Sequence, residues 1–156
     1  MKDINKRKEK IGILLPAYNE EQTIKDVIIE FHNALPEAEI CVIDNASTDN
    51  TASISRDTMQ SLMAPGKVIF EAVLGKGNAI RRAFIELDWD IYIMVDADLT
   101  YSSVDLPYLL RPVIENIADI VVGNRYPISN KENQRFRRFH EFGNNLVKSI
   151  INFVFN

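Results

Sequence analysis

Short apolar runs alternate along this chain with segments whose apolar residues recur at helical spacing. Each run is continuous rather than alternating with polar residues, which is typical of strands buried on both faces. The expected strands are "IGILL" (11–15), "EICVI" (39–43), "KVIF" (67–70), "IYIMV" (91–95) and "DIVVG" (119–123). Because helical segments separate them, this order predicts an α/β domain with a mostly parallel sheet and helices on both faces.

The helical segments are recognised by their apolar stripes. After the first strand, Asn19 is expected to cap a helix, with Gln22 at the capping-box position. The stripe of this helix is Ile24, Val27, Ile28 and Phe31. The other helices are expected over 78–87 (Ile80, Ala83, Phe84 and Leu87 on one face), 105–116 (Pro112 a candidate point for a bend or break) and 142–155 (Leu146, Ile150, Phe153 and Val154).

Polar and glycine-rich residues follow every expected strand. The five clusters are "PAYNEE", "DNASTDNT", "AVLGKGN", "DADLTY" and "GNRY". The carboxyl ends of parallel strands meet at one edge of the sheet, and open α/β sheets bind their ligands there. The pattern therefore predicts a ligand site at this edge.

Asp96 and Asp98 are the most informative pair at this edge. Residues i and i+2 of a strand share a face, so the two carboxylates are expected to converge. They suit one Mg²⁺ or Mn²⁺ ion, which prefers oxygen ligands and is often shared with substrate phosphates. Two alternatives stay open: an ordinary acidic loop, or a nucleophile paired with a proton donor.

Two further stretches at the edge contain candidates for binding. "GKGN" (75–78) opens a helix, where glycine lets the backbone approach an anion and Lys76 adds a positive charge. An ordinary glycine turn is the alternative, since the spacing is not that of a Walker motif. Asp44 is a candidate acceptor for a base or ribose, whereas Asp49 is expected to cap the following turn.

Composition indicates a globular domain rather than a secreted or membrane-spanning one. The chain has 156 residues, 46% of them hydrophobic, and one cysteine. Cys41 lies in an apolar run and is interpreted as a small buried hydrophobe, so a reducing, cytoplasmic compartment is expected. The N-terminus shows no signal-peptide pattern, and no run approaches the roughly 18–20 apolar residues of a membrane span.

Charge is distributed unevenly. Residues 1–10 form a basic N-terminal segment of charge +3, residues 125–156 carry +4, and residues 11–124 carry −11. An acidic body does not favour nucleic acid as a partner, whereas a basic tail suits phosphate or an anionic membrane. Arg135, Arg137 and Arg138 beside two phenylalanines are either a solvated face or an arginine fork for phosphate.

Together these stretches resemble glycosyltransferase family 2, whose enzymes have the GT-A fold. "LLPAYNEE", "VIDNASTDNT", "GKGNAIRRAF", "VDADLTY" and "VGNRY" occur in the order and spacing of the family. Residues 11–156 are therefore expected to be a Rossmann-like GT-A catalytic domain. The stretch from "DADLTY" to "GNRY", with the following "RRFHEFGNNLVK", is most similar to the dolichyl- or polyprenyl-phosphate sugar transferases.

The resemblance implies a UDP- or GDP-sugar donor, a Mg²⁺ or Mn²⁺ ion and a polyprenyl-phosphate acceptor at the cytoplasmic membrane surface. It assigns the donor site to Pro16, Ala17, Tyr18, Glu20, Asp44, Lys76, Gly77 and Asp96. Asp96 and Asp98 would hold the metal, with Asp98 favoured as the direct ligand, and Arg125 would lie near the sugar or phosphates. Arg137, Arg138 and Asn145 would serve the acceptor phosphate.

The chain also departs from the family pattern. Asn45 and Ala46 stand where many members have a second aspartate and a glycine. The chain is shorter than the catalytic domain of most members, so the expected inverting transfer has an alternative, a nucleotide-sugar-binding module without turnover. A second alternative is a haloacid-dehalogenase-type phosphatase, because "DADLT" also fits its signature with Asp96 as nucleophile and Asp98 as acid.

Overall fold

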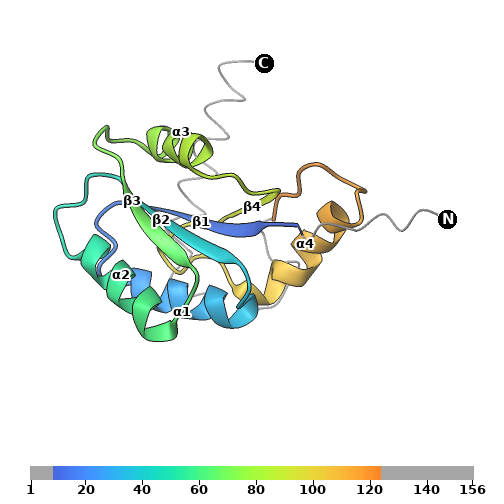
Figure 1. Cartoon of the computed structure of the whole chain (residues 1–156), viewed down its shortest axis with the longest axis horizontal. Helices are drawn as coiled ribbons and strands as arrows, with labels where there is room; N and C mark the ends of the chain where they lie inside the picture. The colour runs from blue at the N-terminus through green and yellow to red at the C-terminus, as the bar shows by residue number, and fades with distance from the viewer. Residues whose placement is uncertain (1–8, 124–156) are drawn as a thin grey trace, which may run out of the picture. The chain divides into compact units, whose positions relative to one another are not determined.

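A computed structural model describes residues 9–123 (Figure 1). Nearly all of these belong to one compact unit, Met1–Val121, while the second unit, Val122–Asn156, lies almost wholly outside the described residues. In chain order the elements are β1 (Ile11–Ala17), α1 (Ile24–Ala34), β2 (Glu39–Asp44), α2 (Thr51–Leu62), β3 (Gly66–Phe70), α3 (Lys76–Glu86), β4 (Ile91–Met94), the short 3₁₀ helix η1 (Ser103–Asp105) and α4 (Leu106–Ile114).

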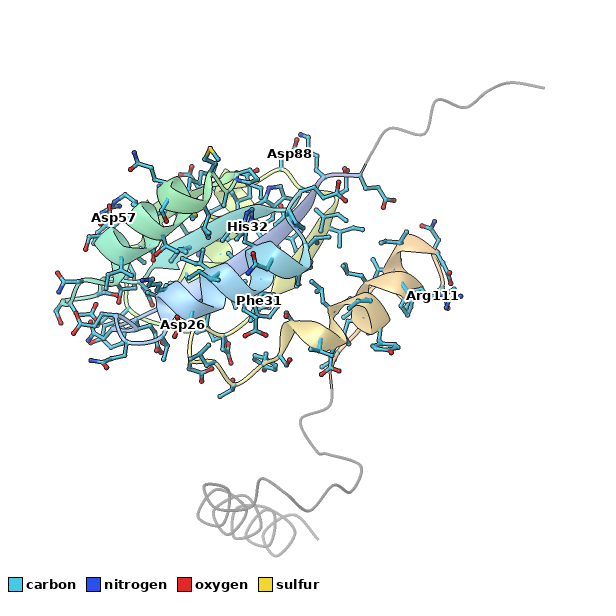
Figure 2. All side chains as sticks on the ribbon, turned by 90° about the horizontal axis from the view of Figure 1, so that it is seen from below. Asp26, Phe31, His32, Asp57, Asp88 and Arg111 are labelled. Atoms are coloured by element: carbon cyan, nitrogen blue, oxygen red, sulfur yellow. The ribbon has the colours of Figure 1, made fainter. Side chains whose placement is uncertain are left out.

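The four strands form one parallel sheet in the order β3-β2-β1-β4. Helices α1 and α2 cover one face, where they lie in front of the strands in Figure 2, and α3 covers the other (Figure 1). This arrangement confirms the predicted α/β class with helices on both faces. Its parallel pairing aligns Ala17 at the end of β1 with Asp44 at the end of β2, so the loops that follow start side by side.

The core has one layer on each side of the sheet. On the side of α1, the predicted stripe of Ile24, Val27, Ile28 and Phe31 is buried against β1, β2 and β4. On the side of α3, Cys41 packs with Ala79, Ala83 and Leu87. Cys41 is fully buried, and burial raises the pKa of its thiol to about 12, which confirms that it is a core residue.

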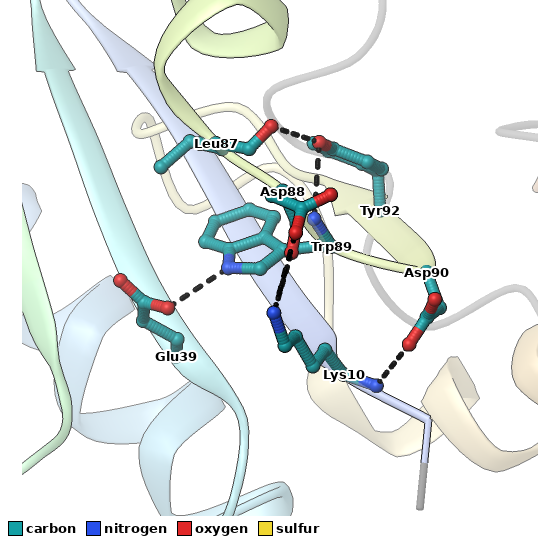
Figure 3. Close-up of polar contacts among 7 residues, drawn as sticks. All are labelled: Lys10, Glu39, Leu87, Asp88, Trp89, Asp90 and Tyr92. Carbon is teal, nitrogen blue, oxygen red and sulfur yellow. Dashed lines mark hydrogen bonds and ion pairs between the residues drawn. The ribbon is translucent and has the colours of Figure 1, made fainter. Parts of the chain in front are cut away.

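The single tryptophan closes the α3 side near the amino ends of the strands (Figure 3). The Trp89 indole N–H donates to Glu39 Oε2 at 2.9 Å, and the Tyr92 hydroxyl donates to the Leu87 carbonyl at 2.8 Å. The indole lies so close to β1 that a Cβ added at Gly12 would be 2.0 Å from Trp89 Cδ2. Glycine at this position is therefore a packing requirement of the tryptophan.

The strand predictions hold best in the centre of the sheet. β1 and β2 are buried along most of their length, as expected. β3 and β4 are edge strands of the described sheet, and their burial is partial, so the prediction of burial on both faces is wrong for them. The fifth strand, predicted over 119–123, is also wrong: these residues are irregular, and Ile120 is 80% exposed.

Two helix predictions need correction at the level of single residues. The N-cap of α1 is Thr23 rather than Asn19, which has a φ of 55° and belongs to the preceding loop. In α3 the buried residues are Ala79 and Ala83, whereas Phe84 is 55% exposed and stacks edge-on against Tyr92.

The remaining two helices of the described part differ in how well the pattern predicted them. Pro112 does not break α4, which continues to Ile114. Helix α2 was not predicted, because its buried residues are mainly threonine and serine rather than aliphatic residues. The predicted helix over 142–155 lies outside the described residues. Within residues 9–123, no helix has the length and apolar character needed to cross a membrane.

Candidate functional site

A pocket of about 270 Å³ opens at the carboxyl ends of the strands. It is lined by Pro16, Ala17, Tyr18, Glu20, Asn45, Lys76, Ala79, Asp96, Ala97 and Asp98. The lining comes from the end of β1, from the loops after β1, β2 and β4 and from the start of α3, so the parallel topology has brought distant segments of the chain to one place. Seven residues that the sequence assigned to the donor or metal lie here, namely Pro16, Ala17, Tyr18, Glu20, Lys76, Asp96 and Asp98.

The other predicted site residues do not line this pocket. Asp44 is 6% exposed, and its Oδ1 accepts a hydrogen bond from the Ser47 N–H at 3.1 Å. Gly77 lies in the first turn of α3 with open space where a Cβ would stand. The remaining four, Arg125, Arg137, Arg138 and Asn145, lie outside the described residues.

The two aspartates face the pocket because their neighbours are held in the core. Val95 and Ala97 are buried in the layer on the side of α1, and the alternation of side chains leaves Asp96 and Asp98 at the pocket. The Ala97 carbonyl also accepts a hydrogen bond of 2.7 Å from the Thr23 hydroxyl at the start of α1. The segment that carries the aspartates is thus tied to the helix beneath it.

Each aspartate already has a polar partner on the chain. The Lys76 ammonium forms an ion pair with Asp96 Oδ1 across the pocket. Asp98 Oδ1 accepts hydrogen bonds from the backbone N–H of Thr100 at 3.1 Å and from its hydroxyl at 2.6 Å. Leu99, which lies between Asp98 and Thr100, has a φ of 59° in the left-handed region.

The carboxylates of Asp96 and Asp98 fit a divalent cation whose coordination sphere is completed by a bound ligand. Two carboxylates offer the hard oxygen ligands that Mg²⁺ and Mn²⁺ prefer. Within residues 9–123, no group of three or more His, Cys, Asp or Glu side chains is arranged to hold a metal. Asp96 and Asp98 would therefore supply part of a coordination sphere, and phosphate oxygens and water would supply the rest.

Asp49 has the structural role that its sequence position predicts. Its Oδ1 accepts from the Thr51 N–H at 3.0 Å and its Oδ2 from the Glu21 N–H at 3.1 Å. Burial raises the pKa of Asp49, but the hydrogen bonds from Thr51 and Glu21 outweigh it and leave the pKa below its ordinary value. Asp49 thus joins the loop after β1 to the start of α2 and does not line the pocket.

Asn45 is a pocket residue to which the sequence assigned no role. It follows β2 directly, is 4% exposed and lines the pocket beside Lys76. Its backbone N–H donates to the Ala17 carbonyl at 2.8 Å. The only signal in the sequence was its departure from the family pattern, and that departure says nothing of what its side chain contacts.

The pocket with its two carboxylates, its lysine and the glycine-led helix α3 lies at the carboxyl edge of a parallel α/β sheet, the place where open α/β domains bind their ligands. Comparison with known families makes this specific. The profile of Glycosyl transferase family 2 matches residues 12–155, and the chain belongs to this family. The membership overturns the phosphatase alternative for the two aspartates.

Relatives in the family include proteins of different lengths. The chain is 39% identical over 131 residues to the protein RfbJ of Shigella flexneri. This match covers 83% of this chain and 95% of RfbJ. It is 33% identical over 133 residues to the dolichol-phosphate mannosyltransferase of Pyrococcus furiosus, covering 83% of this chain and 37% of that enzyme. The glycosyltransferase AglJ of Haloferax volcanii is 31% identical, and the match spans 92% of this chain and 45% of AglJ.

Solved structures share the fold. Glucosyl-3-phosphoglycerate synthase from Mycobacterium tuberculosis, in complex with Mn²⁺, uridine diphosphate and phosphoglyceric acid, is 27% identical with a TM-score of 0.58. The match covers 67% of this chain and 39% of the synthase chain. The expected GT-A architecture is therefore confirmed, and the matched part of the chain covers well under half of that enzyme.

Proposed function

We propose that this chain is the donor-binding part of a metal-dependent, inverting glycosyltransferase that moves a sugar from a UDP- or GDP-sugar to a polyprenyl phosphate. The observation that carries the proposal is the convergence of Asp96, Asp98 and Lys76 in one pocket with the loop after β1. Family membership supports the reaction class. Complexes of the mycobacterial synthase with Mn²⁺ or Mg²⁺ and uridine diphosphate support the metal and the donor.

The residues of the chain divide the work of binding the donor. Asp96 and Asp98 hold the divalent ion, and Lys76 places a further positive charge beside it, where a diphosphate would lie. When bound, the ion neutralises the charge that develops on the departing nucleotide diphosphate. The segment 16–20, Asp44 and Gly77 hold the nucleotide.

The residues assigned to the acceptor phosphate come later in the chain than the donor site. Arg125 is assigned to the sugar or its phosphates, and Arg137, Arg138 and Asn145 to the acceptor phosphate, all by position in the family motifs. A phosphate oxygen is already anionic, so attack on the anomeric carbon needs no general base, whereas a hydroxyl acceptor would need one. The likeness to a dolichol-phosphate mannosyltransferase supports the phosphate acceptor, which implies peripheral contact with the cytoplasmic membrane surface.

Titration calorimetry with UDP-sugars and GDP-sugars, with and without Mn²⁺, tests the donor site. We expect binding that depends on the metal, and Asp98→Asn should weaken it at least about tenfold because a charged ligand of the ion is lost. Asp57→Asn is the matched control: it makes the same chemical change at an exposed position on α2 (Figure 2). Equal affinity in wild type and Asp98→Asn would refute the assignment.

A transfer assay separates the enzyme from a binding module. The chain is incubated with the donor that binds and with a short-chain polyprenyl phosphate in detergent, and the glycolipid product is measured by mass spectrometry. Formation of the sugar-phosphate product supports the proposed acceptor. Metal-dependent donor binding without transfer or hydrolysis would instead support the alternative of a nucleotide-sugar-binding module.

A further inference from the structure

The side chain of Asn45 makes three hydrogen bonds to the loop between β3 and α3, and the proposed function gives them no role. Its Nδ2 donates to the carbonyls of Glu71 at 3.2 Å and Val73 at 2.7 Å. Its Oδ1 accepts from the Gly75 N–H at 2.7 Å. The amide therefore contacts this loop at three places, 26 to 30 residues along the chain.

These three partners require an amide at position 45. Backbone carbonyls only accept hydrogen bonds and a backbone N–H only donates, so the loop needs two donors and one acceptor. Asparagine supplies all of them from one side chain, and its orientation follows from the partners. A carboxylate could accept from Gly75, but it would direct negative oxygens at two carbonyl oxygens.

Outside Asn45, the Glu71 N–H donates to the Asp44 carbonyl at 2.9 Å, the Asn78 side-chain amide donates to the Leu74 carbonyl at 3.0 Å, and the Val73 N–H donates to Glu71 Oε1 within the loop. The side chains of Val73 and Leu74 are 61% and 59% exposed, so burial holds them only weakly. Gly75 is the N-cap of α3 and has a φ of 124°, a backbone conformation that L side chains rarely adopt. Because Asn45 is 4% exposed, its hydrogen bonds are largely protected from competing water.

The residue that follows Gly75 is Lys76, which forms the ion pair with Asp96 in the pocket. The direction of the lysine side chain depends on where α3 begins, and α3 begins where the amide of Asn45 holds Gly75. We propose that Asn45 is a positioning residue that acts through this loop to place Lys76 beside the metal and diphosphate site. The proposal rests on the proposed donor site for its functional consequence.

The first test compares Asn45→Asp with wild type by titration of Mn²⁺ and UDP. At pH 8 the introduced carboxylate is repelled by the two carbonyls, and we expect UDP affinity in saturating Mn²⁺ to fall about tenfold, the effect of one to two ordinary hydrogen bonds. Affinity for Mn²⁺ alone should not fall, because Asp96 and Asp98 are untouched and a displaced Lys76 competes less for the Asp96 carboxylate. Asn33→Asp, the same change at an exposed position of α1, is the matched control.

The pH profile distinguishes positioning from a general loss of structure. Carbonyl neighbours favour the protonated form of the introduced carboxyl, which can again donate one hydrogen bond to the loop. The wild-type to Asn45→Asp ratio of UDP affinity should therefore shrink from about tenfold at pH 8 to about threefold at pH 5.5. A ratio near one at both values, or one that grows as the pH falls, would overturn the proposal.

A second measurement needs no ligand. In wild type and Asn45→Ala, hydrogen exchange of the Gly75 and Lys76 amides is followed by NMR, with thermal unfolding as a check on the fold. We expect at least about tenfold faster exchange at Gly75 in the variant, since its hydrogen-bond acceptor is removed. Unchanged exchange would refute the positioning role even if the chain bound no nucleotide, whereas failure of wild type to bind UDP would count only against the donor site.

Discussion

A divalent ion bound to Asp96 and Asp98 would compete with Lys76 for the Asp96 carboxylate. We therefore predict that removing the lysine charge changes the affinities for Mn²⁺ and for UDP in opposite directions. The lysine pairs with Asp96 Oδ1 when no metal is present. An ion bound to both aspartates has to displace the ammonium or share the carboxylate with it. Lys76→Met keeps the length of the side chain and removes its charge. We therefore expect the variant to bind Mn²⁺ alone more tightly, but UDP in the presence of Mn²⁺ more weakly.

The size of the first effect follows from the exposure of the pair. The side chains of Lys76 and Asp96 are 55% and 22% exposed, so solvent screens their attraction. Ion pairs of this kind contribute about 0.2–1 kcal/mol. Since 1.4 kcal/mol corresponds to tenfold, removal of the competition should tighten Mn²⁺ binding by about 1.4- to 5-fold. The gain should shrink at 0.5 M salt, because screening weakens exposed charges.

Electron paramagnetic resonance of free Mn²⁺ measures the first affinity, and titration calorimetry with UDP in saturating Mn²⁺ measures the second. Lys67→Met is the matched control. It removes the same charge from β3 near the amino end of the strand, away from the pocket lining, and should leave both affinities unchanged. Mn²⁺ binding by Lys76→Met that is equal to or weaker than that of wild type would refute the competition between lysine and metal.

Two predictions concern the stability of the fold. Gly12→Ala should lower the free energy of unfolding by about 1–3 kcal/mol, because the added Cβ would lie 2.0 Å from the Trp89 ring. Denaturant titrations followed by tryptophan fluorescence measure this loss. The control Gly77→Ala, where the space for a Cβ is open, should show no loss. The lowered pKa of Asp49 stabilises the fold above the ordinary carboxyl pKa, and this contribution is lost as the pH falls through the folded-state value. The difference in unfolding free energy between wild type and Asp49→Asn should therefore decrease from pH 7 towards pH 3, and a constant difference would contradict it.

The sequence predicted the centre of the fold better than its borders. β1 and β2 are buried on both faces, and a continuous apolar run is the pattern that such strands produce. The run at 119–123 has the same pattern but forms no strand in the described part of the chain. Whether an apolar run pairs with a neighbour depends on the tertiary structure, and no local pattern reports it. Helix α2 was missed for the opposite reason, because small polar residues form its buried face.

The site was predictable to the extent that topology alone creates it. Parallel strands bring their carboxyl ends together, so polar residues after the strands had to meet, and most of the predicted residues share one pocket. The pairing of Lys76 with Asp96 and the contacts of Asn45 depend instead on the conformation of loops. Gly75 shows why: its positive φ sets the course of the chain into α3, and its position in "GKGN" does not specify that angle.

Polar residues at the carboxyl edge serve two purposes that look alike in the sequence. Asp49 accepts from two backbone N–H groups and joins neighbouring loops, while Asp98 lines the pocket. Both follow apolar strands by a few residues, and both are aspartates. Their effects should separate on substitution: a change at Asp49 acts on stability first, and a change at Asp98 acts on metal-dependent binding in a chain that stays folded. Asn45 combines the two purposes, because it lines the pocket and holds the loop that delivers Lys76, so its variants should alter binding through loop order rather than through direct contact with the ion.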